Sequence, residues 1–392
     1  MRVLYHISYY KPAYIYGGPV ISTSNLCEGL AALGVQVTVM TTNANGQQRL
    51  AVPLETPVEV NGVEVIYCPL GFTGQYFYSP RLVEIFRKVV SQYDLIVTDS
   101  FLTYLLGGTA SAALAAQKPY IIPIRGQLFP WALKQSAIKK QIYMRVSGRR
   151  WLNEAAGLHC TTPEEETAVQ QLGLTAPTFT VPNSIDTQAF AELKATDHIR
   201  QHYGIPLACM LLVQVGRLVA IKRPDISVKV LAALHHTHLI LAGPCDPAFE
   251  EQLKSDARKW GCLDRLHFTG LLDNEGVKPI LASADLLLMP SEVQENFGTA
   301  AAEALAAGIP VLTSTGIPIG RWAMEEQAGF ATECTPEHFV DAARKLCADP
   351  EGLKQMGKRA RHFMQQFEKK AVAQRMLSQY ERIIELQRRK PQ

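Results

Sequence analysis

Residues 289–311, MPSEVQENFGTAAAEALAAGIPV, decide the fold of this chain. An apolar strand ends at Met289, a short polar loop follows, and an alanine-rich helix begins near Phe297 or Gly298. The helix ends at Gly308, since glycine is typical of helix C-termini, and a second apolar strand covers 309–312. Two apolar strands joined by a helix predict a parallel sheet in an α/β fold.

The start of this helix has the chemistry of an anion site. Its first N–H groups have no partner inside the helix, and the helix dipole places partial positive charge there, which suits a diphosphate. Gly298 has no side chain, so a ligand can approach the backbone. Glu295 precedes the helix, and Glu303 lies about 7.5 Å beyond Gly298 along the axis, so the two carboxylates flank the phosphate position. Each glutamate alone is explained more simply by the dipole or by core packing, but together with Pro290 and Asn296 the string favours a nucleotide sugar.

Short apolar strands alternate with helices through the whole chain, as they do in residues 289–311. The series pauses at the turn-rich stretch 181–186, which predicts two Rossmann-like domains whose ligands bind at the carboxyl ends of the strands, in a cleft between the domains. We expect an N-terminal domain over residues 1–185, joined by a C-terminal helix at about 370–392, and a C-terminal domain over residues 186–369. The predicted strands of the two series are 3–7, 35–40, 63–67, 95–98, 120–124, 157–160 and 179–181, then 210–215, 238–242, 266–268, 284–289 and 309–312.

Two further loops follow predicted strands. Gly216 opens a loop that carries Arg217 and Lys222, and two cations at a strand end can neutralise a diphosphate and stabilise it as a leaving group. A solvated basic loop is the simpler interpretation of these cations by themselves. Gly17 and Gly18 follow the first strand, where backbone N–H groups can approach a phosphate or an acceptor. The chain has neither GxGxxG nor GxxxxGK[ST], so the sequence argues against a dinucleotide fingerprint and a P-loop.

The composition narrows the class of protein. The 392 residues are 47% hydrophobic and 19% charged with a net charge of +3, which argues against disorder and against nucleic-acid binding. The eight cysteines form no CxxC pair or zinc-spaced cluster, and no apolar run approaches the roughly 20 residues of a membrane span. We therefore expect a cytoplasmic protein, with a peripheral location at the inner face of the plasma membrane as the alternative, and we expect no metal and no cofactor.

These motifs together resemble the retaining GT-B glycosyltransferases of family 4. The resemblance rests on Gly216-Arg217 and Lys222, on Glu295 and Glu303 with seven residues between them, and on the Gly17-Gly18 loop, and it spans essentially the whole chain. It implies a GT-B fold with a C-terminal helix that crosses back to the N-terminal domain. It also implies catalytic roles for Arg217, Lys222 and Glu295.

The resemblance further implies a set of donor-binding residues. It places the ribose at Glu303, the base at Leu271 and Leu272, and the phosphates at the Gly17-Gly18 loop and the helix start near Gly298. The implied donor-binding residues are Gly17, Gly18, Arg125, Gly216, Leu271, Leu272, Pro290, Asn296, Phe297, Gly298, Thr299 and Glu303.

Arg125 is a departure from the family, because many relatives carry histidine there. Arginine does not act as a base at ordinary pH, so Arg125 is expected to hold an acceptor anion or the donor. The Arg125-Gly126 form resembles a bacterial subgroup that builds exopolysaccharide or lipopolysaccharide. Nearby, residues 134–150 hold six cations and no acid, interleaved with apolar residues, which predicts a basic amphipathic helix. Two interpretations remain open: the helix contacts anionic lipid, or it covers the core of the domain and its basic face is simply solvated.

The resulting expectation is a retaining, metal-independent hexosyltransferase. It moves a hexosyl unit from a nucleotide diphosphate sugar, with UDP-glucose favoured, to a growing polysaccharide or a lipid-linked saccharide. The alternatives are a GDP-mannose-dependent mannosyltransferase and a non-catalytic nucleotide-sugar binding protein. A phosphorylase or an epimerase of the same fold, and a Rossmann oxidoreductase, are more distant competitors.

Overall fold

The computed structural model describes residues 1–71, 77–99, 101–193 and 197–389. The chain divides into two compact units, and each is described by itself. Unit 1 comprises Met1–Ser184 and the C-terminal segment from Lys369, and unit 2 comprises Ile185–Glu368. The boundaries of these units lie one residue from the domain limits at 185 and 369 expected from the sequence.

Unit 1 is built around an eight-stranded sheet in the order β10-β9-β8-β7-β1-β2-β6-β5. Neighbouring strands are parallel except β5 and β6, which pair antiparallel. The strands of unit 1 are β1 (Arg2–His6), β2 (Gln36–Thr42), β3 (Ala44–Asn45), β4 (Gln48–Arg49), β5 (Val58–Val60), β6 (Val63–Cys68), β7 (Leu95–Thr98), β8 (Tyr120–Pro123), β9 (Gly157–Cys160) and β10 (Thr178–Thr180). The helices of unit 1 are η1 (Tyr14–Tyr16), α1 (Gly18–Ala32), α2 (Pro80–Val89), η3 (Val90–Gln92), α3 (Tyr104–Ala115), α4 (Pro130–Lys134), α5 (Ala137–Tyr143), η4 (Met144–Gly148), α6 (Arg149–Glu154), α7 (Pro163–Gln170) and α17 (Lys369–Arg388).

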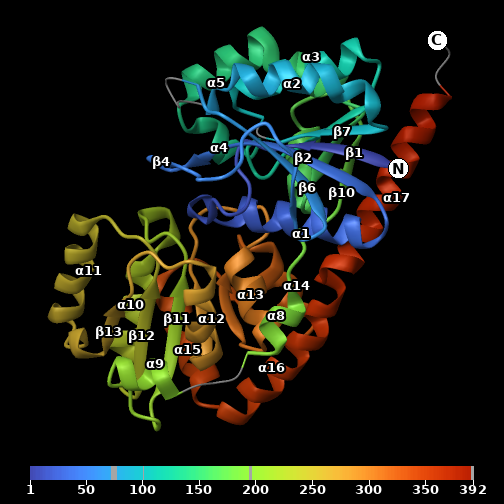
Figure 1. Ribbon diagram of the computed structural model, residues 1–392. Coiled ribbons are helices and arrows are strands. Elements are labelled where there is room, and N and C mark those ends of the chain that lie inside the picture. Colours follow the sequence, from blue (N-terminus) through green and yellow to red (C-terminus); the bar gives the residue numbers. More distant parts are fainter. Residues whose placement is uncertain (72–76, 100, 194–196, 390–392) are drawn as a thin grey trace. The chain divides into compact units, whose positions relative to one another are not determined.

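The sheet of unit 1 is buried on both faces, which explains the continuous apolar runs of its strands. Successive side chains of a strand point to opposite faces. Val3 and Tyr5 therefore pack into the core formed with α1 and α17, whereas Leu4 packs into the core formed with α2 and α3. In Figure 1, α2 and α3 cover one face of this sheet, and α1 and α17 cover the other.

The last helix of the chain, α17, packs closely against α1. A Cβ on Gly29 of α1 would lie 2.7 Å from the carbonyl oxygen of Lys369 and 2.9 Å from the Cβ of Ala373. Met376 and Tyr380 of α17 are buried in the same core as Val3 and Tyr5. The C-terminal helix expected at 370–392 therefore belongs to unit 1, and residues 390–392 lie outside the described residues. Gly29 makes this close approach between the two helices possible.

Unit 2 is built around a fully parallel six-stranded sheet in the order β13-β12-β11-β14-β15-β16. Its strands are β11 (Met210–Val215), β12 (Thr237–Ala242), β13 (Leu266–Phe268), β14 (Leu286–Met289), β15 (Val311–Ser314) and β16 (Phe330–Thr332). Its helices are α8 (Thr187–Ala191), α9 (Asp197–His202), η5 (Ala220–Lys222), α10 (Pro224–Ala233), α11 (Pro247–Lys259), η6 (Leu263–Arg265), α12 (Asn274–Ser283), α13 (Thr299–Ala307), α14 (Pro318–Glu325), α15 (Pro336–Cys347), α16 (Pro350–Met364) and η7 (Gln365–Phe367). Leu211 and Val213 of β11 face the core with α12, α13 and α16, and Leu212 faces the core with α10, α11 and α15. Unit 2 is thus a helix–sheet–helix sandwich, as the sequence predicts.

The structure corrects two details of the sequence prediction. Residues 134–150 are not one helix, because α4 ends at Lys134 and Ser136 has a left-handed backbone with φ 53° before α5 begins. The sequence analysis did not predict strands β3, β4, β5 and β16, each of which has only two or three residues.

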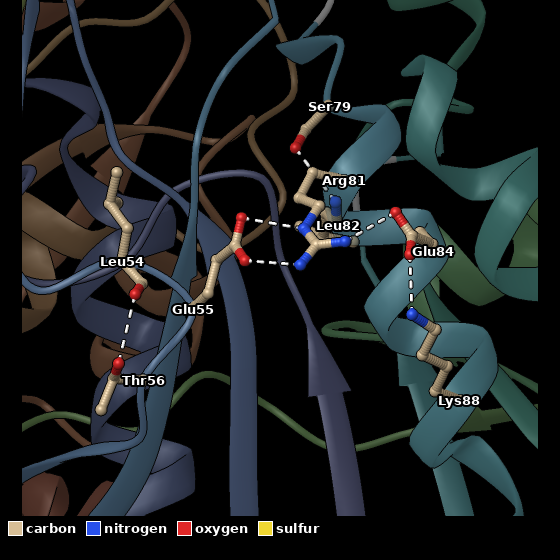
Figure 2. A network of polar contacts seen from close by, with 8 residues as sticks. All are labelled: Leu54, Glu55, Thr56, Ser79, Arg81, Leu82, Glu84 and Lys88. Carbon is tan, nitrogen blue, oxygen red and sulfur yellow. Dashed lines mark hydrogen bonds and ion pairs between the residues drawn. The ribbon is translucent and has the colours of Figure 1, made fainter.

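A network of charged side chains ties α2 to the segment before β5 (Figure 2). Arg81 donates from Nε and Nη2 to the two carboxylate oxygens of Glu55 at 2.9 and 2.8 Å, and from Nη1 to Glu84 at 2.8 Å. Lys88 donates to Glu84 at 2.7 Å, and the Ser79 hydroxyl caps the helix by accepting from the Leu82 N–H at 3.3 Å. The groups are solvent-exposed, so the network orients α2 more than it stabilises the fold.

Among the described residues, no helix is both long enough and apolar enough to cross a membrane.

Candidate donor site

The topology of unit 2 brings the two strongest sequence motifs together. Strands β11 and β14 are neighbours although they are far apart in sequence, so the order of the sheet reverses between them. Ligands of parallel α/β sheets bind outside the carboxyl ends of strands at such a reversal. The loop after β11 carries Gly216 to Lys222, and the loop after β14 carries Pro290 to Gly298. Both loops therefore start at the position where the fold favours a ligand.

Helix α13 begins without a side-chain cap at this position. Its N-cap is Gly298, which has φ 100°, and the first N–H groups, of Thr299 and Ala300, have no hydrogen-bond acceptor among the described residues. A Cβ on Gly298 would lie 2.5 Å from Cγ2 of Ile317 and 3.0 Å from Cγ2 of Ile319. Glycine is therefore required here by backbone conformation and by packing. The open N–H groups have the chemistry that the sequence predicts for an anion position.

Glu303 is buried on α13 without a compensating partner. The residue is 7% exposed, its carboxylate has no hydrogen-bond or ion-pair partner among the described residues, and its oxygens keep a small contact with solvent. Burial raises its pKa from 4.5 to about 7, and the Lys278 ammonium opposes this rise only in part. A buried carboxylate with unused acceptor oxygens is costly unless another group pairs with it. A ligand hydroxyl is a suitable partner.

Lys222 and Glu295 form an ion pair across the two loops. Their side chains are 23% and 15% exposed, so water screens the pair only partly. The loops are also joined through the backbone, because the Glu292 N–H donates to the Ile221 carbonyl at 2.9 Å. The cation predicted for the diphosphate and the carboxylate predicted for the sugar therefore pair with each other in this structure.

Arg217 is exposed at the same edge, and its guanidinium has no hydrogen bond or ion pair with the described residues, although its carbonyl accepts from the Val219 N–H at 3.1 Å. It follows Gly216, which has φ 130° and donates its N–H to the Ala242 carbonyl at 2.9 Å. The neighbouring glycine, Gly243, was missed by the sequence analysis. A Cβ on Gly243 would lie 2.0 Å from the Gly216 carbonyl oxygen, so this glycine lets the cationic loop fold onto the end of β12. A glycine directly after a predicted strand was the available signal.

Gly316 is a second residue that the sequence analysis missed. Its carbonyl accepts from the Glu295 N–H at 3.0 Å, and a Cβ on Gly316 would lie 3.1 Å from the Val293 carbonyl oxygen. The Ser314 hydroxyl also donates to the Ser291 carbonyl at 2.6 Å. The loop after β15 thus fixes the position of the Glu295 loop from its other side.

The remaining predicted residues of unit 2 divide into two groups. Phe297 is fully buried and packs against Trp322 and Phe367, with ring centroids 6.2 and 5.7 Å away, so only its backbone can contact a ligand. Leu271 is 62% exposed directly after the Gly270 turn, which is unusual for a large apolar side chain and leaves it available to a flat base. The others lie along the same loops: Leu272 before α12, Pro290 and Asn296 between β14 and α13, and Thr299 as the first residue of α13.

In unit 1, Gly17 and Gly18 lie where the sequence predicts, at the start of α1. Gly17 is the N-cap residue with φ 68° and ψ −137°, and Gly18 is the first residue of the helix. Strands β1 and β7 are neighbours in the sheet, so this glycine turn also follows a strand at the point where the sheet order reverses. No side chain caps α1.

Arg125 is buried in unit 1 and bonded to protein groups. Its Nε donates to Asp99 at 2.6 Å, Nη1 to the Ser22 hydroxyl at 2.9 Å, and Nη2 to the Thr23 hydroxyl at 2.7 Å. Burial is the largest single influence and lowers its pKa, but Asp99 and Tyr5 together outweigh burial, so the pKa is raised. The side chains of Arg125 and Asp99 are 9% and 3% exposed. The guanidinium therefore ties the start of α1 to the ends of β7 and β8, and most of its donors are already used.

The turn that carries Arg125 is held by a buried carboxylate. Arg125 has φ 49° and Gly126 φ 75°, and the Gly126 N–H donates to Glu165. Glu165 also accepts from the N–H and the hydroxyl of Thr161 at 2.6 and 2.8 Å. Burial raises the pKa of Glu165, and these hydrogen bonds oppose the rise. Nothing in the sequence indicates this role, because Glu165 lies 40 residues beyond Arg125 in a helix with two neighbouring glutamates.

Among the described residues, no group of three or more His, Cys, Asp or Glu side chains is placed to hold a metal ion.

Comparisons with known proteins connect this geometry to a family. Residues 195–363 match the family model of glycosyl transferases group 1, and residues 17–184 match that of a glycosyl transferase 4-like domain. A GDP-mannose-dependent alpha-(1-6)-phosphatidylinositol dimannoside mannosyltransferase of Mycobacterium tuberculosis is 32% identical over 197 residues, which are 49% of this chain and 49% of that protein. The chain thus aligns with about half the length of the first curated relatives that it matches.

Two further comparisons extend over nearly the whole chain. A D-inositol 3-phosphate glycosyltransferase of Kineococcus radiotolerans is 25% identical over an alignment of 408 positions, gaps included, which covers 94% of this chain and 91% of that protein. The crystal structure of Anabaena HepE in complex with UDP-glucose superposes with a TM-score of 0.75 and 19% identity, over 97% of this chain and 100% of that chain. At this identity the structural likeness shows the fold, which is GT-B. With both of its halves matched by these models, this chain belongs to the GT-B glycosyltransferases of family 4.

Proposed function

We propose that this glycosyltransferase is a retaining, metal-independent hexosyltransferase that uses a nucleotide diphosphate sugar. One observation carries the proposal. An uncapped helix start, a pair of loop cations and two carboxylates, one of them buried without a partner, gather at a single edge of the unit 2 sheet. Each group matches one part of such a donor: the diphosphate, the sugar or the ribose.

The diphosphate would bind at the start of α13. The N–H groups of Thr299 and Ala300 and the helix dipole supply preorganised positive charge. Arg217 adds an exposed guanidinium with five N–H donors, and Lys222 adds a compact ammonium group. Charge that is already in position stabilises a leaving group at no cost of reorganisation. These groups are sufficient in kind to replace the divalent metal that other transferases use, so we expect activity in the presence of EDTA.

The ion pair between Lys222 and Glu295 suggests how the two side chains respond to a donor. A bound diphosphate would compete for the Lys222 ammonium, because it carries two negative charges and the Glu295 carboxylate carries one. Glu295 would then be free to accept hydrogen bonds from hydroxyl groups of the sugar. In this proposal Glu295 positions the sugar and does not attack it.

Retention of configuration would follow from attack on the same face as departure. As the bond to the diphosphate breaks, its oxygen gains charge and can take the proton from the incoming acceptor hydroxyl. The transition state is oxocarbenium-like, so the largest contribution of the protein is to stabilise the leaving group. Glu303 would accept hydrogen bonds from the ribose, which relieves the cost of its unpaired burial.

The base and the sugar of the donor are the least constrained part of the proposal. UDP-glucose is the favoured donor, and exposed Leu271 and the adjacent Leu272 would pack against the base. GDP-mannose is the second candidate, since the relative at 32% identity is named as GDP-mannose-dependent. The acceptor would be a growing polysaccharide or a lipid-linked saccharide, and the names of the relatives add phosphorylated inositol as an acceptor class to test.

A binding panel followed by a turnover assay tests the proposal. Thermal shifts are measured with UDP-glucose, GDP-mannose and ADP-glucose, because a ligand that binds only the folded state raises the melting temperature. The donor with the largest shift is then incubated with candidate acceptors and EDTA, and the anomeric configuration of the product is read by NMR. The absence of any shift refutes the donor site. A shift with no hydrolysis or transfer favours a non-catalytic binding protein.

Variants separate the catalytic from the binding role. Glu295→Gln preserves shape but removes the charge, and we expect the transfer rate to fall by about 100-fold, the scale of lost substrate positioning. Lys259→Gln, which neutralises an exposed cation on α11 of the same unit, is the matched control and should behave as wild type. A full transfer rate in Glu295→Gln would end the assignment of that residue.

A further inference from the structure

Residues 137–154 of unit 1 form one continuous helical segment that runs through α5, the π-helical turn η4 and α6. Its inner side is anchored to the unit 1 core. The Tyr143 hydroxyl donates to the Phe101 carbonyl at 2.9 Å, and the two rings lie 5.5 Å apart. Met144 packs against the same core. The segment therefore has a fixed outer face.

The outer face presents three large apolar side chains to solvent. Ile138, Ile142 and Val146 are 75%, 59% and 77% exposed. Their spacing of four residues exceeds one α-helical turn, so each step along an α-helix would rotate by about 40°. The π-turn at 144–148 winds more slowly and offsets this drift, so Val146 stays near the line of the two isoleucines. Single exposed apolar residues are common, but an aligned row of three is not explained by packing.

The apolar row is flanked by unpaired cations. Lys134, Lys139 and Arg145 are exposed, and none of them has a hydrogen bond or ion pair with any residue that the structure describes. Residues 134–150 contain no acid, and the first acid beyond them, Glu154, is already paired with Arg150 at 3.1 Å. The local charge is therefore positive and uncompensated, although the whole chain has a net charge of only +3.

We propose that this basic apolar face, defined by Ile138, Ile142, Val146, Lys134, Lys139 and Arg145, binds the surface of an anionic lipid bilayer. A helix that lies in the membrane interface buries an apolar row at the boundary of headgroups and acyl chains, while its cations meet the negatively charged headgroups. The π-turn serves this arrangement by keeping the row straight. The tyrosine and methionine on the inner side hold the helix to the body of unit 1, so the whole unit is carried to the surface.

Charge favours lipid over a protein partner as the occupant. The three cations surround the apolar row without making a pocket or a shape that would select one partner. An anionic leaflet is a uniform field of negative charge that needs no such shape. The inference concerns binding alone, and it stands whatever the donor of the enzyme proves to be.

Vesicle sedimentation of the full chain tests the inference. We expect the protein to pellet with vesicles of phosphatidylglycerol and phosphatidylcholine, to do so less at high salt, and to remain in the supernatant with phosphatidylcholine alone. The variant Lys134→Gln/Lys139→Gln/Arg145→Gln should partition about 100-fold more weakly, since each cation near an anionic surface contributes roughly a factor of five. The variant Ile138→Ser/Ile142→Ser/Val146→Ser should lose at least about 10-fold through the apolar contribution alone.

Two matched variants in unit 2 control for charge and for apolar exposure. Lys259→Gln/Lys345→Gln/Lys358→Gln removes the same charge from exposed positions, and Leu207→Ser removes an apolar side chain that is 75% exposed. Both should pellet as wild type does. Because all the substituted side chains are exposed, circular dichroism should show folded protein throughout. Equal binding to neutral and anionic vesicles, or equal loss in the control triple, would overturn the inference.

Discussion

The buried carboxylate of Glu303 leads to a prediction about stability and pH. Burial raises its pKa from 4.5 to about 7 in the folded protein, so the folded state holds a proton that the unfolded state has already released. Below pH 4.5 both states are protonated and the stabilisation is fully present. Between pH 4.5 and 7 only the unfolded state ionises, so the free energy of unfolding falls as pH rises. The full difference corresponds to about 3 kcal/mol.

The variant Glu303→Gln removes this dependence, because an amide does not titrate. The amide keeps the size of the side chain, and the cost of burying it is the same at every pH. We therefore expect the variant to gain stability relative to wild type by about 2 kcal/mol between pH 5 and pH 8. Other groups that titrate in this range, such as the histidines, are common to both proteins and cancel in the difference.

Urea unfolding at pH 5, 6, 7 and 8, followed by tryptophan fluorescence and circular dichroism, measures this difference. Glu325→Gln, an exposed carboxylate on α14 of the same unit, is the control and should give a difference that is constant with pH. If Glu303→Gln also gives a constant difference, the carboxylate is solvated or paired in solution. Its proposed role as an unsatisfied acceptor that waits for a ribose would then be refuted.

Three further substitutions test the remaining contacts. Lys222→Met leaves Glu295 without its cation and removes one donor to the diphosphate, so steady-state kinetics should show kcat/KM about 100- to 1,000-fold lower, and an unchanged value would refute its role. Gly298→Ala places a side chain on a residue with φ 100° and in contact with Ile317, so urea unfolding should show a free energy of unfolding about 2–4 kcal/mol lower. The loss should be larger than for the control Gly34→Ala, where φ is 84° and no atom lies within 4 Å of the new Cβ. Arg125→Met leaves a buried carboxylate without its cation, so the free energy of unfolding should fall by about 3–5 kcal/mol, and a fall below 1 kcal/mol would contradict the buried pairing.

Much of the fold could be predicted from the sequence because parallel strands buried on both faces leave continuous apolar runs. Residues 210–215 and 266–268 were predicted as strands with the bounds that the structure gives them. The same reasoning failed where local chemistry was weak. Strand β16 is too short to show the alternation of apolar and polar residues by which a half-buried strand is recognised. The break at Ser136 depends on a left-handed backbone conformation, which a serine residue does not indicate.

The two α/β series, the glycine at the start of α13 and the residue types needed to hold a diphosphate can all be read from the amino-acid sequence, because each depends on neighbours within a few positions. The contacts that those residues make are visible only in the folded chain. Sheet order made β11 and β14 neighbours, which paired Lys222 with Glu295 across 72 intervening residues, and folding buried Glu303 away from any partner that the structure describes. Folding also pairs Arg125 with Asp99, whereas the sequence predicts a ligand contact for Arg125. Such pairings depend on how distant segments pack, and packing between distant segments leaves no local pattern in a single chain.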